Sequence, residues 1–197
     1  MANGKWPKQK TKIMLLLLIR HGETVENTKH ILQGCTPGTL TDEGRRQADA
    51  TGRALHRRLS AVTATVPSDS SEGIPSILLL SSDLQRCKDT TAILNTHLHL
   101  PVEYTPLLRE RDWGSITGMI VDGVTKVRIP DDAETVPQMK ERARRFLAQA
   151  AAHPTATTII AVSHGLFCRC IQAVHQGVEI ADIERMHNGE IREIILP

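Results

Sequence analysis

The chain has 197 residues, of which 40% are hydrophobic and 23% charged, with 24 Lys and Arg side chains against 22 Asp and Glu. This length suits one domain of about 100 to 200 residues, which can bury a sizeable core without a disulfide framework. The formal net charge of +2 and the five aromatic side chains (two Trp, one Tyr, two Phe) supply too little attraction and stacking for nucleic-acid binding. We therefore expect no nucleic-acid partner and a core built from aliphatic side chains.

The N-terminal segment combines basic residues with a short apolar run. Lysines between Lys5 and Lys12 precede the run Ile13 to Ile19, which is the order found in secretory signals. However, the run stops at Arg20 without a small-residue cleavage site and is too short to cross about 30 Å of hydrocarbon. We expect residues 1–12 to form a disordered basic tail, residues 13–197 to form a single domain, and no association with a membrane.

The four cysteines contain no Cys-x-x-Cys pair and no spacing typical of a zinc site; they are Cys35, Cys87, Cys168 and Cys170. This pattern favours reduced thiols and a cytoplasmic location.

Short apolar stretches predict the strands of a sheet. Continuous apolar runs at residues 13–19, 77–80 and 158–162 are too short for helices and are typical of strands that are covered on both faces. Weaker strand candidates are residues 102–105 and 191–196.

Between these runs the apolar spacing changes to that of helices, each with one buried face. The three stripes are Ala48, Thr51, Leu55, Leu59 and Val62 after Thr41-Asp42; Leu84, Cys87, Thr91, Leu94 and Leu98 after Asp83; and Val136, Met139, Ala143, Phe146, Leu147 and Ala150 after Thr135. Strands that alternate with helices require crossover connections. We therefore predict an α/β fold with three layers, in which a mostly parallel central sheet carries helices on both faces.

Two stretches interrupt the alternation of strands and helices. Residues 63–76 are rich in Ser, Pro and Asp and predict an exposed loop. Residues 114–132 predict a loop or a short helix that covers a cleft.

Reactive residues follow four of the predicted strands. Arg20-His21-Gly22 follows the first strand, and Ser163-His164-Gly165 follows the strand at 158–162. Arg86 comes in the first turn of the helix after residues 77–80, and Arg109-Glu110 follows residues 102–105. Because ligands of open α/β sheets bind at the carboxyl ends of the strands, the two histidines, the two arginines Arg20 and Arg86, and the Glu110 carboxylate should meet at one edge.

This set of side chains matches phosphoryl transfer. Arginine grips phosphate oxygens two at a time and stays charged, and an imidazole can carry a phosphoryl group covalently. A carboxyl group can protonate the leaving oxygen and later deprotonate a water. A glycine after each histidine lets the backbone approach the ligand. Each piece alone is weak, since a single His-Gly more often marks a turn; the coincidence at four strand ends carries the prediction.

Other phosphoryl-transfer enzymes and metal sites have different sequence motifs. The chain has no Gly-x-x-x-x-Gly-Lys-Ser/Thr loop, no Asp-x-Asp pair and no cysteine followed six positions later by arginine. His97-x-His99 and Cys168-Arg169-Cys170 would point different ways on a helix, which favours packing or solvated roles over metal binding.

Taken together, these residues resemble the histidine phosphatase superfamily, also called phosphoglycerate mutase-like. The resemblance covers residues 13 to 196 and rests on Arg20-His21-Gly22-Glu23-Thr24 with Asn27 and Gln33-Gly34; Ser81 to Arg86 with Thr90, Thr91 and Ala92; Leu107 to Glu110 with Gly114 and Gly118; and Val162 to Gly165. It implies the phosphoglycerate mutase-like fold and a catalytic domain at residues 13–197.

The resemblance also implies roles for individual residues. The catalytic group is His21 as nucleophile, Glu110 as proton donor and His164. The phosphate-binding residues are Arg20, Asn27, Arg86, His164 and the backbone at Gly22, and the substrate-binding residues are Gln33 and Gly34. No metal and no cofactor are implied, and the partner is a small phosphorylated metabolite such as a sugar phosphate.

Some positions depart from the family pattern. Leu166 stands where mutases of the family usually have Asn, and the insert after the third motif is short and poor in arginine, so phosphatase is favoured over mutase. Ala133-Glu134-Thr135 replaces the usual Gly-Glu-Ser/Thr, which makes the turn there uncertain. Arg169 matches a position often filled by Arg in phosphatases, although a solvated helix charge explains it equally well.

Three functions remain open. The first is a phosphomonoester hydrolase that acts through a phosphohistidine without a metal, the second is a phosphoglycerate mutase, and the third is a non-catalytic relative that binds phosphorylated ligands. Because both histidines, Arg86 and Glu110 are present, the third ranks last.

Overall fold

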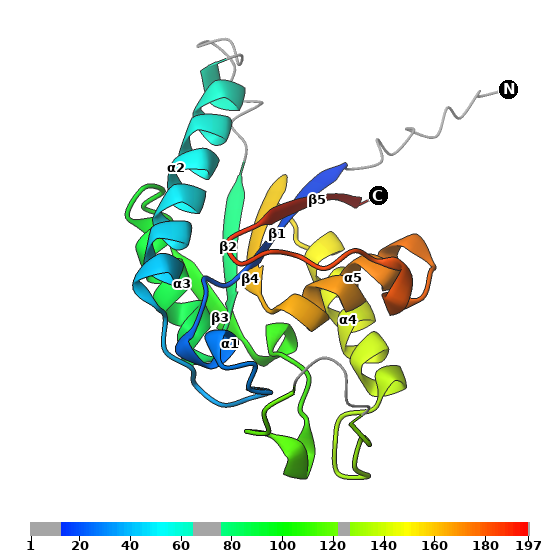
Figure 1. Cartoon of the computed structure of the whole chain (residues 1–197). Coiled ribbons are helices and arrows are strands. Elements are labelled where there is room, and N and C mark those ends of the chain that lie inside the picture. The colour runs from blue at the N-terminus through cyan, green and yellow to red at the C-terminus, as the bar shows by residue number, and fades with distance from the viewer. Residues whose placement is uncertain (1–12, 65–75, 122–126, 197) are drawn as a thin grey trace, which may run out of the picture.

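A five-stranded sheet lies at the centre of the computed structural model, which describes residues 13–64, 76–121 and 127–196 (Figure 1). Its strand order is β3-β2-β4-β1-β5. The strands are β1 (Met14–Arg20), β2 (Ile77–Ser82), β3 (Val102–Thr105), β4 (Thr158–Ser163) and β5 (Ile191–Leu196). All neighbours pair in parallel except β1 and β5, which are antiparallel.

The five predicted strands are confirmed with shifts of no more than two residues at their ends. The continuous apolar runs became the inner strands: every residue of β4 is buried, because helices cover both of its faces. The edge strand β5 instead alternates, with Ile194 and Leu196 buried and Ile195 exposed.

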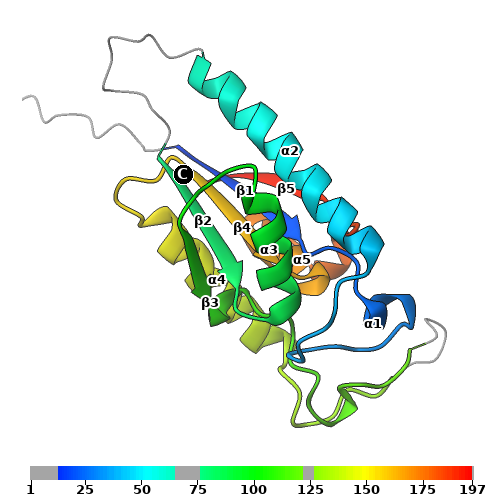
Figure 2. The same ribbon diagram turned by 90° about the vertical axis from the view of Figure 1, so that its left-hand side faces the viewer.

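Helices cover both faces of the sheet (Figure 2). They are α2 (Asp42–Ala64) and α3 (Gln85–Asn95) on one face, and α4 (Val136–Ala151) and α5 (Gly165–Gln176) on the other. The short helix α1 (Val25–Thr28) and the 3₁₀ turns η1 (Pro106–Leu108), η2 (Gly114–Ile116) and η3 (Ile180–Asp182) connect these layers. The predicted three-layer, mostly parallel α/β fold is therefore confirmed.

Two hydrophobic cores separate the layers. One joins alternate residues of β1 and β4, such as Leu18 and Ile159, to Phe146 of α4 and Phe167 of α5. The other joins the opposite faces of those strands to Leu55 of α2 and to residues of α3. Leu55 and Leu94 from the predicted stripes pack in the second core, and Met139 and Phe146 pack in the first. Val136 is instead exposed, because it is the first residue of α4, beside the Thr135 N-cap.

The two interrupting stretches are only partly described. Helix α2 continues to Ala64, so the predicted loop at 63–76 starts later than expected, and residues 65–75 lie outside the described part. The segment from 114 contains η2 and a β-bridge between Ile31 and Ile120, while residues 122–126 are not described. The predicted tail at 1–12 also lies outside the described residues.

All four cysteines are free thiols. No helix within the described ranges is long and apolar enough to span a bilayer.

Candidate active site

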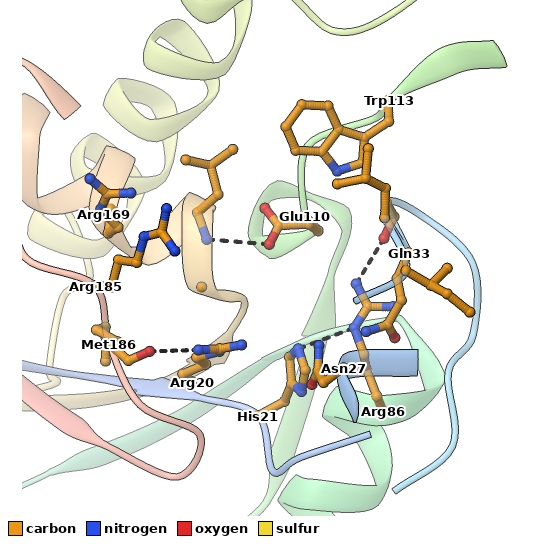
Figure 3. A pocket seen from close by; sticks show the side chains of 15 residues that line it. Arg20, His21, Asn27, Gln33, Arg86, Glu110, Trp113, Arg169, Arg185 and Met186 are labelled. Atoms are coloured by element: carbon orange, nitrogen blue, oxygen red, sulfur yellow. Dashed lines mark hydrogen bonds between the residues drawn. The ribbon is translucent and has the colours of Figure 1, made fainter. Parts of the chain in front are cut away.

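The carboxyl ends of β1, β2 and β4 meet at one edge of the sheet, where a cavity of ≈ 330 Å³ opens (Figure 3). Its volume suits a small molecule. The cavity is lined by Arg20, His21, Asn27, Ile31, Leu32, Gln33, Gly34, Arg86, Glu110, Trp113, Gly165, Leu166, Arg169, Arg185 and Met186.

His21 lies at the base of the cavity, directly after β1, and is 3% exposed. Its Nδ1 lies 2.7 Å from the carbonyl oxygen of Gly22. Because a carbonyl only accepts hydrogen bonds, Nδ1 carries the ring proton and Nε2 carries the lone pair. Burial, followed by the charges of Arg86 and Arg20, holds the pKa of His21 well below its usual 6.5. The ring is therefore neutral near pH 7, with Nε2 available as a nucleophile.

Arg86 lies between the two histidines. Its Nε is 3.2 Å from Nε2 of His21 and 3.1 Å from Nδ1 of His164. Its terminal nitrogens donate to the carbonyl oxygens of Thr36 and Gly34. Arg86 is 1% exposed. Its hydrogen bonds fix the plane of the guanidinium from the side of the loop after α1 and from the side of the two histidines.

His164 is fully buried behind Arg86 and does not line the cavity. Since its Nδ1 accepts from Arg86, Nε2 carries the proton and donates to Oγ of Ser82 at 2.9 Å. Burial and the neighbouring Arg86 lower its pKa well below 6.5. His164 is thus placed to orient Arg86 rather than to touch a ligand.

Arg20 and Asn27 present further donors beside His21. One terminal nitrogen of Arg20 donates to the carbonyl oxygen of Met186 at 2.6 Å, while its buried Nε has no hydrogen-bond partner within the described residues. Oδ1 of Asn27 accepts from the backbone N–H of Thr24 in a capping box. This bond turns the amide group so that its two N–H donors remain for a ligand.

Glu110 enters the cavity from the segment that follows η1. One carboxylate oxygen accepts from its neighbour's backbone N–H at Arg111, and the other accepts from the N–H of Leu166 at 3.3 Å. Leu166 lies in the first turn of α5, so the positive end of this helix faces the carboxylate. Glu110, the one carboxylate among the described residues that line the cavity, is therefore held by two backbone donors.

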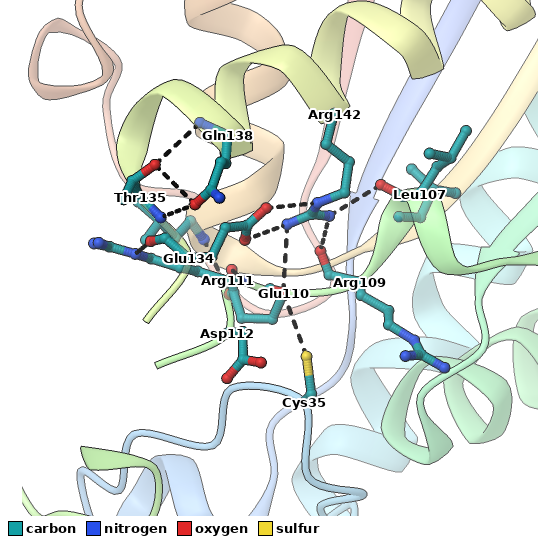
Figure 4. A network of polar contacts seen from close by, with 12 residues as sticks. Cys35, Leu107, Arg109, Glu110, Arg111, Asp112, Glu134, Thr135, Gln138 and Arg142 are labelled. Atoms are coloured by element: carbon teal, nitrogen blue, oxygen red, sulfur yellow. Dashed lines mark hydrogen bonds and ion pairs between the residues drawn. The ribbon is translucent and has the colours of Figure 1, made fainter. Parts of the chain in front are cut away.

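The segment that carries Glu110 is held from behind by Arg142 of α4 (Figure 4). The guanidinium donates to the carbonyl oxygens of Leu107 and Arg109 at 3.0 and 2.7 Å, and it pairs with Glu134 at 2.7 Å. It also lies over the ring of Phe167 at 3.9 Å from the centroid. Replacement of the usual Gly by Ala133 leaves the turn intact, because Thr135 still caps α4 through a capping box with Gln138.

The structure brings seven of the predicted site residues to the cavity wall, namely Arg20, His21, Asn27, Gln33, Gly34, Arg86 and Glu110. Gly22 is not among the lining residues, and its N–H donates to Oγ1 of Thr90 instead of facing the cavity. A Cβ at Gly22 would lie 2.3 Å from the carbonyl oxygen of Gly44, so close packing against α2 explains the glycine. A direct phosphate contact by Gly22 therefore has no support in this geometry.

Arg109, the neighbour of Glu110, does not reach the cavity. It forms a two-bond ion pair with Asp83, with N···O distances of 2.7 and 2.6 Å. Of these two neighbours, only Glu110 was among the predicted site residues. Adjacent side chains on an extended segment face opposite ways, which explains why Arg109 points away from Glu110.

Several residues of the site were missed from the sequence. Trp113, Arg185 and Met186 line the cavity from irregular segments that have no periodic signal. Asn188 donates to the carbonyl oxygen of His21 at 2.9 Å. Arg142 could have been found, because it lies on the helix face of Met139 and Phe146, where a charge requires a buried partner.

The cavity lining, as far as the chain is described, contains four arginines and one carboxylate, a set that favours an anionic ligand over a cation. Within the described residues, no three His, Cys, Asp or Glu side chains are grouped as metal ligands. His97, from the His-x-His pair, instead contacts Asp49 of α2, with Nε2 2.7 Å from Oδ1.

Comparison with known proteins assigns the family. A broad-specificity phosphatase of Saccharomyces cerevisiae is 33% identical over 140 residues, or 70% of this chain and 55% of the yeast protein, so the chain spans about half the length of that relative. A metal-independent phosphoserine phosphatase of Arabidopsis thaliana is 28% identical over 186 residues, covering 85% of this chain and 72% of that one. The solved structure of the Mycobacterium tuberculosis open reading frame Rv3214 superposes with a TM-score of 0.72 at 28% identity, covering 90% of this chain and 89% of that one. The family model for the histidine phosphatase superfamily (branch 1) matches residues 16–196, and the chain therefore belongs to this superfamily.

Proposed function

We propose that the protein hydrolyses small phosphomonoesters through a phosphohistidine on His21, without a metal ion. The observation that carries this proposal is the position of His21, whose Nε2 carries the lone pair and lies 3.2 Å from Nε of Arg86, in the wall of a cavity that Arg20 and Glu110 also line. A nucleophile, cationic donors and a carboxyl group are the parts that this reaction requires.

In the first step, Nε2 of His21 attacks the phosphorus atom as the ester P–O bond breaks. The guanidinium groups of Arg20 and Arg86 and the amide of Asn27 stabilise the charge on the phosphoryl oxygens. The Glu110 carboxyl, in its protonated form, gives its proton to the leaving oxygen, so the product alcohol departs neutral. The Nδ1–H bond to Gly22 stabilises the imidazolium-like ring that forms.

In the second step, the Glu110 carboxylate accepts a proton from a water that attacks the phosphorus atom. The N–P bond then breaks, which releases inorganic phosphate and returns His21 to its neutral form. Glu110 regains the proton that it had given to the alcohol, so the cycle is balanced.

The size of the cavity and the family favour a small substrate. A volume of ≈ 330 Å³ accommodates a metabolite rather than a folded protein segment. Several relatives are named phosphatases, among them a metal-independent one, while another is named a probable phosphoglycerate mutase. Leu166 in place of Asn favours hydrolase over mutase.

The direct test is hydrolysis of 4-nitrophenyl phosphate by the purified chain with a chelator present. We expect chelator-resistant release of phosphate, its loss in His21→Ala, and its retention in the control His175→Ala, an exposed residue near the C-terminal end of α5. Chelator-sensitive turnover, or an active His21→Ala protein that keeps its circular dichroism spectrum, would refute the proposal. Interconversion of phosphoglycerate isomers without release of phosphate would assign a mutase instead.

A further inference from the structure

Arg185 presents an unpaired positive charge at the cavity. It follows η3 on the segment that leads to β5, is exposed, and lines the cavity wall. No hydrogen bond or ion pair joins its guanidinium to another described residue. The acidic residues closest to it in sequence are engaged elsewhere, since Glu184 and Glu190 both pair with Arg192.

The neighbours of Arg185 are cations as well. Figure 3 shows it on the same side of the cavity as Arg20 and Arg169. Its charge acts to lower the pKa of both of these arginines, with burial as the larger cause. Three guanidinium groups thus face one wall, and their mutual repulsion is relieved when an anion enters.

Arg169 has a structural role, because two of its donor nitrogens bind backbone carbonyl oxygens. Its Nε and one terminal nitrogen donate to the carbonyl oxygens of Ile183 and Ile180, each at 2.8 Å. These bonds hold the segment before Arg185 against α5. Arg185, by contrast, gives none of its guanidinium donors to another residue in the described part of the chain, and the segment before it is held in place by Arg169.

Arg185 is also separate from the groups around the nucleophile. Figure 3 shows Arg185 on the far side of Arg20 from His21, and the side chain that contacts Nε2 of His21 is Arg86, at 3.2 Å. A phosphoryl group on His21 is therefore served by Arg20, Arg86 and Asn27, and Arg185 faces the part of the cavity that the rest of the substrate would fill.

We infer, on the basis of the proposed function, that Arg185 binds a second anionic group of the substrate. The preferred substrates are then small phosphomonoesters that carry a carboxylate, or a further phosphate, on the alcohol that leaves. A bidentate guanidinium contact would fix the orientation of that alcohol relative to Glu110.

The test compares substrates that differ in charge alone. One pair is rigid and consists of 4-carboxyphenyl phosphate and 4-carbamoylphenyl phosphate. The other pair, phosphoglycolate and its amide, is short and flexible. Two different distances between phosphate and carboxylate are thereby tested. For at least one pair, the full chain should hydrolyse the carboxylate with a higher kcat/KM than the amide. In Arg185→Gln the ratio of kcat/KM for the carboxylate to kcat/KM for the amide should fall about ten- to hundredfold, which is the effect of one charge-assisted hydrogen bond.

Two further variants complete the test. Arg185→Lys keeps the charge and should retain most of the ratio, and Arg144→Gln, an exposed arginine on α4, should leave it unchanged. The backbone of the adjacent Met186 accepts from Arg20, so a distorted loop would slow both members of a pair equally. Equal loss, or no carboxylate preference in an active wild type, would overturn the inference, whereas failure to hydrolyse any of the four esters would count against the proposed function itself.

Discussion

The imidazole rings of His21 and His164 meet edge to face, with centroids 5.2 Å apart and planes at 63°. They come from the ends of β1 and β4, which pair in register as far as Arg20 and Ser163. The single Nε–H of Arg86 lies within 3.2 Å of a nitrogen in each ring. Two buried neutral imidazoles thus share one guanidinium donor, and several properties of the protein depend on this arrangement.

The first expectation concerns stability and pH. Burial and the charge of Arg86 lower the pKa of both histidines in the folded state, while an unfolded histidine titrates near 6.5. Below that pH the unfolded chain binds more protons than the folded one, so stability falls as the pH decreases. Each histidine contributes a slope of up to about 1.4 kcal/mol per pH unit, and the contribution is fully present only above the unfolded pKa.

Urea unfolding at pH 7.5, 6.5 and 5.5 measures this slope. His164→Gln should flatten it, whereas His175→Gln, an exposed residue, should not. An unchanged slope in His164→Gln would mean that this histidine is protonated in the folded protein.

Arg86→Lys should impair both activity and stability although the charge is kept. The guanidinium contacts two histidines and the carbonyl oxygens of Thr36 and Gly34 at once, and one ammonium group cannot span these positions. We expect kcat/KM to fall about 10²- to 10³-fold and the free energy of unfolding to fall by about 1–3 kcal/mol as buried acceptors lose donors. Near-wild-type kinetics would show that charge alone suffices.

Glu110→Gln should distinguish substrates by their leaving groups. An alkyl oxygen needs a proton to depart, whereas 4-nitrophenolate leaves without one, so kcat/KM should fall about 10²- to 10⁴-fold for an alkyl phosphate and much less for 4-nitrophenyl phosphate. The ratio kcat/KM reports the step that forms phosphohistidine, which keeps the later hydrolysis out of the comparison. Equal losses for the two esters would remove Glu110 as the proton donor.

Arg142 and Glu134 should couple in a double-mutant cycle. Their side chains are 17% and 15% exposed, and removal of one partner leaves a buried charge without its counterion. We expect Arg142→Met to cost about 3–5 kcal/mol of unfolding free energy and Glu134→Gln to cost little more in that background. Because Arg142 also holds the backbone beside Glu110, its variant should share the leaving-group dependence of Glu110→Gln, which a purely structural role would not produce.

The strands and three of the helices could be predicted from the sequence because their burial is periodic or continuous. The run at 158–162 became the fully buried β4, and Phe146 and Met139 marked the buried face of α4. Helix α5 is not among the three predicted helices, and its N-cap is His164 rather than a residue with a capping oxygen.

The catalytic edge was predictable for a similar reason: parallel strands deliver their carboxyl ends to one side. The positions of the other site residues depend on contacts between segments that are distant in sequence, and local sequence patterns do not reveal such contacts. Arg185 reaches the cavity because Arg169 fastens the loop before it, and Arg109 is drawn away by Asp83.

The central claim is tested most directly by trapping the phosphorylated enzyme. Rapid quenching of the full chain with a ³²P-labelled phosphomonoester, followed by peptide mapping, should find an acid-labile, base-stable label on His21 that forms and decays at least as fast as turnover. Glu110→Gln, with an alkyl ester as substrate, should form the label more slowly, and His21→Ala should not form it. Rapid turnover with no label on His21, or a label on another residue that keeps pace with turnover, would contradict the account.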